Sequence, residues 1–312
     1  MSSLLLQNDG RPTLPGRFRG LNPCPGGGGR SCPVSTCDHF RMDVAGAVSD
    51  FVRSAGFEVT APVDLRSTNN VVIWLAPSPV VAKISDDGAR SLRELEIARA
   101  LESVGAPIVP SLNVGIQQPW RVGGKTVTFW RHQPHDDEET ISAHDTALAL
   151  HLLHSKLATI ECMFVLPSFD VRLRDAVSAL DSPGLPVDLS SGDRLLLRTA
   201  LVEGMARLGS SHSGTRVLHG SPHRMNILSA HGVPVFIDFE TVETGPVGWD
   251  LAHLDREVAD RYPEEINQEA LEICRRTISA ATSTWCWASL ERGPDMRFHA
   301  EQHLEAVRSA MS

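Results

Sequence analysis

The sequence predicts an α+β fold in which a small antiparallel β lobe precedes a larger, mostly helical lobe. Between residues 57 and 85, apolar runs alternate with turn-forming residues, a pattern typical of short antiparallel strands. From residue 146 onward, long segments repeat their apolar residues at helical spacing. The chain has 312 residues, of which 42% are hydrophobic, which is enough for one two-lobed domain with a sizeable core.

The composition argues against two classes of partner. A formal net charge of −9 disfavours nucleic acid, whose partners usually present a basic face, and is compatible with a cationic small-molecule substrate. No apolar run approaches the roughly 20 residues of a membrane-spanning helix. The cysteines near the N-terminus, Cys24, Cys32 and Cys37, lack the spacing of a zinc site. We therefore expect a cytoplasmic protein with reduced thiols and no membrane partner.

Residues 1–41 differ from the rest of the chain. They contain a Pro-Gly-Gly-Gly-Gly run and scattered arginines without periodicity, which predicts a disordered tail. Met42 lies immediately before the first amphipathic segment, so one hypothesis is that translation starts there and the preceding residues are a mis-assigned start. A functional tail is the alternative. We place an N-terminal lobe at 42–131 and a C-terminal lobe at 132–312.

Both lobes can be divided into elements from their apolar patterns. In the first lobe we expect strands over 57–65, 71–76, 79–85, 111–116 and 125–131, and helices over about 43–55 and 88–104. In the second we expect helices over 146–157, 170–181 and 191–208. His151 and His154 on the first of these should pack or form hydrogen bonds. The acidic residues of 255–276 indicate either a rim for a cationic substrate or a solvated helical face.

Lys83 interrupts the apolar strand predicted over 79–85. On the inner face of a sheet, a lysine is unfavourable unless it pairs with a phosphate or a carboxylate. Glu94, on the helix that follows, is the first candidate partner, and Glu96 is the second. Two alternatives remain open at this point: Lys83 could point to water, and Glu94 could complete a capping box that begins at Ser91.

The segment over 217–254 combines polar and apolar residues in an order that indicates a metal-binding site. It reads as two short strands around a polar loop, and residues 233–239 form an apolar run typical of a buried strand. That run contains Asp238, twelve positions after Asn226. An amide and a carboxylate at one end of a hairpin are suitable oxygen ligands for Mg²⁺, which completes its shell with phosphate and water.

At these residues the chain resembles the aminoglycoside phosphotransferase family, which is related to the protein kinases. The matching residues, in order and spacing, are His219, Gly220, Asn226, Ile237, Asp238, Phe239, Glu240, Gly245, Pro246, Trp249, Asp250, Leu251 and Ala252. One position departs from the pattern, because the family's catalytic aspartate is Ser221 here. The resemblance, over about 43–300, implies a two-lobed protein-kinase-like fold. It implies transfer of the γ-phosphate of ATP, or of GTP, to a hydroxyl of an amino sugar, antibiotic or related metabolite.

The resemblance also implies roles for single residues. Lys83 would hold the nucleotide phosphates, with Glu94 orienting it, and Asn226 and Asp238 would bind Mg²⁺. The residues implied to contact the rest of the nucleotide are Ser67, Thr68, Asn69 and Asn70, in a turn that covers phosphate, and Phe129 and Trp130, in a hinge beside adenine. His219 and Asp250 would brace the catalytic loop.

Ser221 leaves the function open in one respect. A serine hydroxyl is too weak an acid to act as a carboxylate base near neutral pH, so His223 and Glu240 are the nearest candidates to replace the missing aspartate. Two alternatives stand beside a small-molecule kinase. One is a kinase for Ser/Thr of a peptide in natural-product biosynthesis, and the other is a nucleotide-binding pseudokinase without transferase activity.

Overall fold

The computed structural model describes residues 34–67, 70–134, 141–182, 188–209 and 215–312. The chain divides into two compact units. We call the described residues of 34–103 and 108–134 the sheet unit, and those of 104–107 and 141–312 the helical unit. No described helix has both the length and the apolar character needed to cross a membrane.

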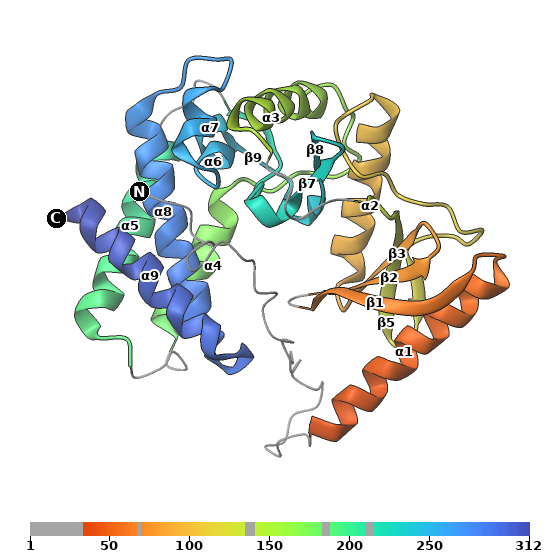
Figure 1. The fold of residues 1–312 in the computed structure, drawn as a ribbon. Coiled ribbons are helices and arrows are strands. Elements are labelled where there is room, and N and C mark those ends of the chain that lie inside the picture. Colours follow the sequence, from red (N-terminus) through yellow and green to blue (C-terminus); the bar gives the residue numbers. More distant parts are fainter. Residues whose placement is uncertain (1–33, 68–69, 135–140, 183–187, 210–214) are drawn as a thin grey trace. The chain divides into compact units, whose positions relative to one another are not determined.

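The sheet unit is built on a five-stranded antiparallel sheet of order β1-β2-β3-β5-β4 (Figure 1). Its strands are β1 Val59–Ser67, β2 Val71–Pro77, β3 Val80–Ser85, β4 Trp120–Val122 and β5 Lys125–Arg131. Every residue of β3 is buried, because this strand lies at the centre of the sheet. The register places Lys83 opposite Val72 on β2 and Thr128 on β5.

One predicted strand of this sheet is wrong. Residues 111–116 form no strand beyond an isolated bridge between Ser111 and Trp130, and the edge strand is β4 instead. Within this segment, the Asn113 side chain accepts a hydrogen bond from the Gly115 N–H at 2.9 Å. This local turn competes with ladder hydrogen bonds and ends the extended conformation.

Two helices accompany the sheet: α1 Val34–Ser54 and α2 Gly88–Ser103. Helix α1 begins at Val34, which corrects the predicted start near residue 43. The tail predicted over 1–41 lies, for residues 1–33, outside the described residues, and its disorder stays a prediction. As expected, Val44, Val48 and Val52 share one buried face of α1 and pack into the core of the sheet unit.

The start of α2 resolves the role of Glu94. Asp87 accepts a hydrogen bond from the Arg90 N–H at 2.9 Å, so Asp87 caps the helix. Ser91 lies inside the first turns, and its hydroxyl donates to the Asp87 carbonyl at 2.9 Å. The capping box that Ser91 and Glu94 could have formed is therefore absent, and the Glu94 side chain is available for another partner.

The helical unit contains long and short helices together with two pairs of short antiparallel strands (Figure 1). Its helices are α3 Ala143–Leu157, α4 Asp170–Asp181, α5 Ser191–Gly209, α6 Val247–Leu251, α7 Arg256–Asp260, α8 Gln268–Trp287 and α9 Pro294–Met311. Its strand pairs are β6 Thr215–Leu218 with β9 Glu243–Pro246, and β7 Ile227–Ala230 with β8 Val233–Phe236. Single 3₁₀ turns are η1 Arg224–Asn226, η2 Phe239–Thr241 and η3 Leu290–Arg292.

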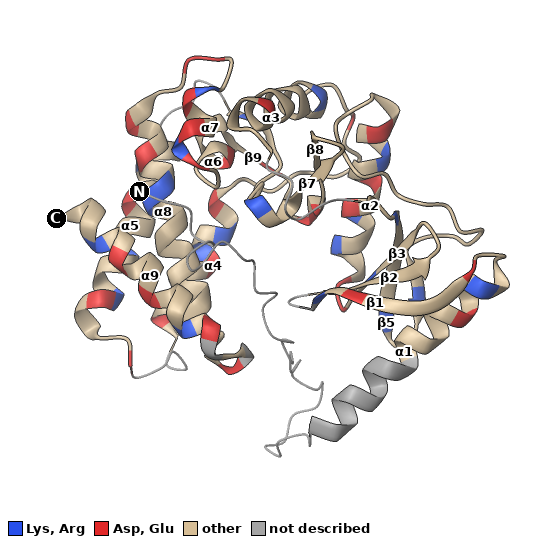
Figure 2. Ribbon diagram, in the orientation of Figure 1, with Lys and Arg blue, Asp and Glu red and all other residues tan. Residues whose placement is uncertain are grey.

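The acidic segment over 255–276 is two helices, α7 and α8, rather than one helical face. Pro263 disfavours helical geometry at the residue before it, and the Asn267 side chain caps α8 by accepting from the Ala270 N–H at 3.0 Å. The carboxylates of this segment alternate with arginines (Figure 2). Ion pairs join Glu264 to Arg216, Glu257 to Arg261, Glu272 to Arg256, and Glu269 to Arg207.

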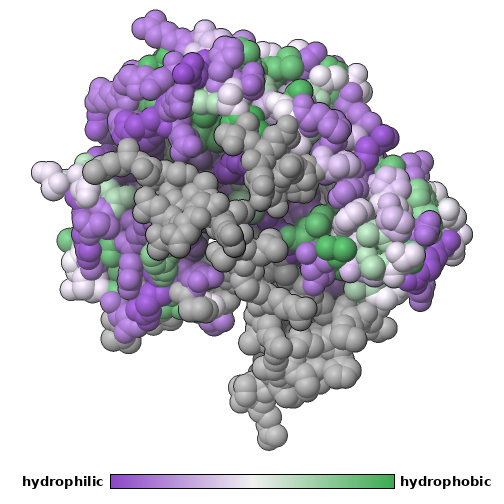
Figure 3. All heavy atoms as spheres, viewed as in Figure 1, coloured by the Kyte–Doolittle hydropathy of each residue, from purple (hydrophilic) through white to green (hydrophobic). Residues whose placement is uncertain are grey.

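These pairs indicate a solvated face rather than a cluster of unpaired acids. Figure 3 agrees, since hydrophilic residues cover most of the visible face of the helical unit, with apolar residues scattered among them. Exposed ion pairs contribute only about 0–1 kcal/mol each to folding. The interior of the unit therefore provides most of its stability, through a core that includes Leu201, Trp249 and Ile278.

Close packing of α5 on α8 generates a test of that core. Gly204 on α5 faces Thr277 on α8, where an added Cβ would lie 2.1 Å from the Thr277 Oγ1. We expect Gly204→Ala to lower the free energy of unfolding by about 1–3 kcal/mol, because overpacking outweighs the gain in helix propensity of roughly 0.5–1 kcal/mol. Urea denaturation followed by circular dichroism measures this change.

Gly192→Ala is the matched control in the same helix, since the nearest atom to its added Cβ is 3.8 Å away. It should leave stability unchanged or slightly higher. Adding Thr277→Ala to Gly204→Ala removes the clashing atoms and should recover part of the loss. A Gly204→Ala variant as stable as Gly192→Ala would contradict the packing of α5 on α8.

Candidate active site

Lys83 and Glu94 form a buried ion pair within the sheet unit. The Lys83 Nζ lies 2.9 Å from each carboxylate oxygen of Glu94, and the two side chains are only 10% and 3% exposed. Glu96, the other candidate partner, pairs with Arg99 at the surface. The sequence left open whether Lys83 points to water or pairs with a glutamate. In the structure it pairs with Glu94. Burying both charges is unfavourable unless each satisfies the other.

The turn predicted to cover phosphate joins β1 to β2, the strands that lead into β3. Ser67 is the last residue of β1, opposite Val71 in the register. Thr68 and Asn69 lie outside the described residues, and Asn70 comes directly before β2. The position of the turn agrees with the prediction, and its role stays a prediction.

Backbone contacts between Phe129 and an adenine edge, as predicted for the hinge, are excluded by the hydrogen bonds that Phe129 already makes, whereas the role of Trp130 stays a prediction. The Phe129 N–H donates to the Gln118 Oε1 at 2.7 Å, and its carbonyl accepts from the Leu112 N–H at 2.8 Å. Both side chains are buried, and the Trp130 Nε1 donates to the Thr128 Oγ1 at 2.9 Å. Both residues are buried near the end of β5, and the backbone N–H and carbonyl of Phe129 already have partners within the sheet unit.

In the helical unit, the loop after β6 is held by the buried carboxylate of Asp250. The Asp250 Oδ2 accepts from the His219 N–H and the Asp250 Oδ1 from the Gly220 N–H, each at 2.8 Å. Burial alone would raise the pKa of Asp250. The hydrogen bond from His154, at 2.9 Å, and the charge of that imidazole outweigh burial and hold the pKa of Asp250 below its ordinary value. The bracing contact that the resemblance implied is therefore present.

His154 extends this network from a distant part of the chain. Its Nε2 meets Asp250 and its Nδ1 meets the Tyr262 hydroxyl at 2.8 Å. This confirms the prediction that His154 forms hydrogen bonds, although neither partner could be named in advance. Asp250 lies 96 positions away in sequence and Tyr262 lies 108 away, so no local pattern could have shown the contact.

His219 connects the loop to the strand that carries Asp238. Its Nε2 lies 2.9 Å from the Ile237 carbonyl and must be protonated to donate to it. Burial lowers the pKa of His219, which leaves Nδ1 as an acceptor for the Ser221 N–H at 3.4 Å. The neutral ring thus spans the two chain segments on either side of the site.

Gly220 cannot be replaced without moving this loop. Its φ of 85° is in the left-handed region, and an added Cβ would lie 2.1 Å from the Thr241 carbonyl oxygen. The Gly220 carbonyl in turn accepts from the Arg172 Nη2 at 2.7 Å. The backbone before Ser221 is therefore positioned from both sides.

Asn226 and Asp238 lie at the same end of the β7–β8 hairpin. The Ile237 N–H donates to the Asn226 carbonyl at 3.0 Å, which brings Asp238 beside Asn226. Strand β8 ends at Phe236 rather than at Phe239, because Asp238 adopts a left-handed conformation with φ 70°. Aspartate tolerates this conformation better than most residues. The Asn226 Nδ2 donates to the Ser221 carbonyl at 3.0 Å, which ties this pair to the loop.

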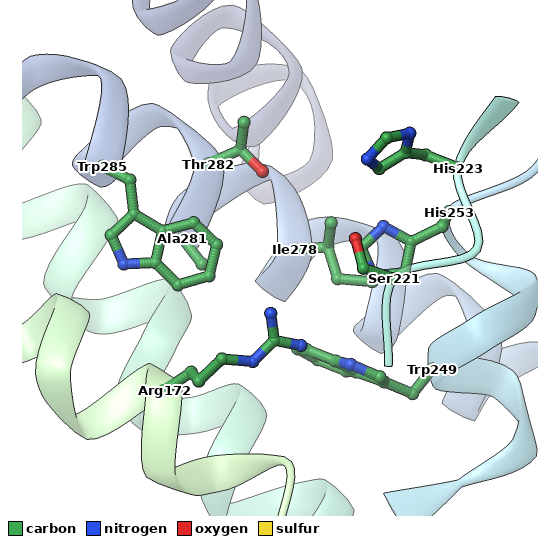
Figure 4. A pocket seen from close by; sticks show the side chains of 9 residues that line it. All are labelled: Arg172, Ser221, His223, Trp249, His253, Ile278, Ala281, Thr282 and Trp285. Atoms are coloured by element: carbon green, nitrogen blue, oxygen red, sulfur yellow. The ribbon is translucent and has the colours of Figure 1, made fainter. Parts of the chain in front are cut away.

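A pocket with a volume of about 110 Å³ opens beside Ser221 in the helical unit (Figure 4). Its lining residues are Arg172, Ser221, His223, Trp249, His253, Ile278, Ala281, Thr282 and Trp285. Figure 4 shows Ser221, His223 and His253 together on one side, facing Trp285 and Thr282 of α8. Of the two candidates to replace the missing aspartate, His223 therefore lines this pocket with Ser221, whereas Glu240 does not.

The pocket contains residues that the sequence did not identify, above all Arg172. The Arg172 Nη2 and Nε donate to the Glu243 carboxylate at 2.8 and 3.2 Å. Burial raises the pKa of Glu243, and the neighbouring Arg172 opposes that rise. Arg172 lies on α4, Glu243 on β9 and Trp285 on α8, three elements with no shared motif, so only the fold brings them together.

Comparison with known proteins decides the family. Residues 59–276 match the family described as the phosphotransferase enzyme family, APH. The chain belongs to this family. No curated protein matches the sequence.

Solved structures of low identity share the fold of this chain. Choline kinase LicA from Streptococcus pneumoniae is 15% identical, with a TM-score of 0.64 over 87% of this chain and 98% of its own. Aminoglycoside 2'-phosphotransferase-IIIa, solved with GDP, is 14% identical, with a TM-score of 0.64 over 86% and 99%. Amicoumacin kinase hAmiN, solved with AMP-PNP, Ca²⁺ and Ami, is 10% identical, with a TM-score of 0.63 over 82% and 91%. The predicted α+β, protein-kinase-like fold is confirmed.

The folded chain should lose stability in mild acid through His253. Burial lowers the pKa of His253 to about 3 from an ordinary value of 6.5. The unfolded chain therefore binds this proton below about pH 6.5, whereas the folded chain does not until about pH 3. Each such group lowers the free energy of unfolding by at most about 1.4 kcal/mol per pH unit in that window.

His253→Gln should make the fall in stability between pH 6.5 and pH 4 shallower, because glutamine binds no proton in either state. His219 and His303, whose pKa values burial also lowers, keep part of the slope in the variant. Urea denaturation at several pH values measures both profiles, which should run parallel above pH 7. Identical slopes in acid would show that His253 titrates normally in the folded protein.

Proposed function

We propose that the chain transfers the terminal phosphate of ATP, or of GTP, to a hydroxyl of a small molecule. The buried pair of Lys83 and Glu94 supports this most strongly, because a lysine held inside a sheet by a carboxylate has little structural benefit of its own. Membership of the phosphotransferase family supports the reaction class. The nucleotides bound to similar structures, GDP and AMP-PNP, support the choice of phosphate donor.

Lys83 would contact the nucleotide phosphates, with Glu94 fixing the direction of its ammonium group. Phosphoryl transfer depends mainly on positioning and on neutralising charge. A lysine that is already ordered loses less conformational freedom when phosphate arrives. Glu94 would thus prepare Lys83 without touching the substrate.

Asn226 and Asp238 are a suitable donor set for Mg²⁺, since they offer one amide oxygen and one carboxylate at one end of a hairpin. The bond from the Asn226 Nδ2 to the Ser221 carbonyl leaves the amide oxygen as the end that would hold the ion. When bound, Mg²⁺ would neutralise charge on the nucleotide phosphates. The left-handed backbone of Asp238 would hold its carboxylate at the end of the strand.

His223 would accept the proton of the attacking hydroxyl in place of the missing aspartate. It lines the pocket together with Ser221, as a base for an acceptor in that pocket must. A positioned base is typically worth about 10²–10⁴ in rate. Ser221 would contribute a hydroxyl that can form a hydrogen bond to the acceptor but cannot take its proton at neutral pH.

Ser221 itself favours one other candidate function. Without a carboxylate at this position, the chain could bind nucleotide through Lys83 and transfer no phosphate. The assays below separate the two, because a pseudokinase would bind nucleotide in all variants that keep Lys83 and would release no phosphate in any of them.

Nucleotide binding should depend on Lys83 and, for its magnesium dependence, on Asp238. We expect Lys83→Met to abolish the rise in melting temperature that ATP and Mg²⁺ cause in the native protein. Asp238→Ala should remove the difference between ATP with and without Mg²⁺. Lys125→Ala is the matched control, since Lys125 is on the same sheet and pairs with Asp86 at the surface. A full shift in the Lys83→Met variant would place the nucleotide elsewhere.

ATP hydrolysis to water tests the base without knowledge of the acceptor. We expect His223→Ala to lower the rate by about 10²-fold or more, as loss of a general base does. Ser221→Asp should add little to the native protein but should restore hydrolysis in the His223→Ala background, because a carboxylate then takes over the proton. Equal rates for native protein and His223→Ala would show that His223 is not the base.

A further inference from the structure

Among the described residues, no carboxylate lines the pocket beside Ser221. Among the residues that line it, the polar groups are the guanidinium of Arg172, two imidazoles, two hydroxyls and the indoles of two tryptophans. On α7 and α8, ion pairs with surface arginines are formed by Glu257, Glu269 and Glu272 instead. Without a carboxylate, a cation in this pocket would have to lie over an aromatic ring, and the Trp285 ring already has the Arg172 guanidinium 6.0 Å from its centroid.

Arg172 is the strongest charge in the pocket, and its partner lies behind it. Glu243 is 1% exposed and does not line the pocket, whereas the Arg172 side chain is 29% exposed. Figure 4 shows the guanidinium pointing into the pocket. The pair is neutral when Glu243 is ionised and positive when Glu243 is protonated. Whether Glu243 is ionised or protonated, the side of the pocket formed by Arg172 does not attract an ammonium group.

The other polar groups also suit a ligand that accepts hydrogen bonds. The buried His253 Nε2 has no hydrogen-bond partner among the described residues, and His253 lines the pocket. A buried polar atom left unpaired is unfavourable by about 1–3 kcal/mol, so a ligand oxygen that meets it gains affinity. Thr282, across the pocket on α8, adds a hydroxyl that can donate as well.

The volume limits how much of a ligand can enter. The pocket measures about 110 Å³. A cavity of about 150 Å³ is known to hold one benzene molecule, so a substituted ring can enter this smaller pocket only in part, by one edge. The flat side chains of Trp249 and Trp285 in the lining suit a ring or another planar group.

We propose that this pocket, which we call the acceptor pocket, binds the hydroxyl-bearing end of a neutral or anionic substrate. That end carries a carbonyl or carboxylate oxygen and a planar group, and it carries no ammonium group. That this hydroxyl receives phosphate rests on the proposed function. The preference for a neutral or anionic ligand over a cationic one depends on the pocket alone. Such a ligand differs from the cationic substrate with which the net charge of the chain is compatible.

Three probes of one shape test the preference for charge in the full chain without nucleotide. These are 3-hydroxybenzoate, 3-hydroxybenzamide and 3-hydroxybenzylamine, which carry the hydroxyl and the variable group on one edge of the ring and are anionic, neutral and cationic at neutral pH. Isothermal titration calorimetry should give dissociation constants for the first two at least about tenfold below that of the third, a difference of about 1.4 kcal/mol. Tighter or equal binding of the amine, or no binding of the benzoate and the benzamide, would overturn the proposal.

Thr282 provides a charge switch in the same pocket. Thr282 is half-buried on the wall opposite Ser221, so Thr282→Asp introduces the missing carboxylate with little added volume. This variant should reverse the preference, so that the amine binds more tightly than the benzoate. Thr282→Asn, which has the same shape without the charge, should keep the native order. An unchanged order in Thr282→Asp would show that the probes bind elsewhere and would overturn the proposal.

A phosphate-transfer assay with ATP and Mg²⁺ separates this inference from the proposed function. The expected binding order without transfer to any probe would overturn the proposed function and support the pocket's preference. Transfer with the amine as the best acceptor would support the proposed function and overturn the pocket's preference for a neutral or anionic ligand. Transfer to the benzoate or the benzamide, reduced in Thr282→Asp but not in Thr282→Asn, would support both.

Discussion

The carboxylate of Asp250 is the contact on which the loop of the helical unit depends. A buried carboxylate must be satisfied on both oxygens, and here two successive backbone N–H groups and one imidazole satisfy it. Because the bonds go to the backbone of His219 and Gly220, they determine the path of the chain just before Ser221. The hairpin with Asn226 and Asp238 then connects to this path through His219. One buried charge thus orders segments that are far apart in sequence.

The sheet unit uses the same principle with a pair of opposite charges. Lys83 and Glu94 each lie where an unpaired charge would be strongly unfavourable, so their contact is retained whenever the unit is folded. The network around Asp250 and the pair of Lys83 and Glu94 therefore both hold their polar groups in fixed positions. The sheet core around Phe129 and the helical core around Trp249 supply the apolar packing that this order requires.

The sequence predicted best those features whose cause is local. Strand and helix positions follow from apolar periodicity, and Lys83 stood out because a charge interrupts an apolar strand. Errors arose where side chains compete with the backbone, as at Asn113, or where a strand residue uses its own backbone groups, as at Phe129. Arg172, His253 and Trp285 were missed because each is unremarkable among its neighbours in sequence and gains its role only from packing across helices.

The way the loop is held has a consequence for the history of the site. Gly220 has no room for a side chain, and the contacts that shape the loop go to backbone atoms on either side of position 221. The side chain of residue 221 therefore contributes little to the geometry of the loop that carries it. Evolution can exchange this side chain while the scaffold stays intact, so a change of chemistry at position 221 needs only a single codon and no structural compensation.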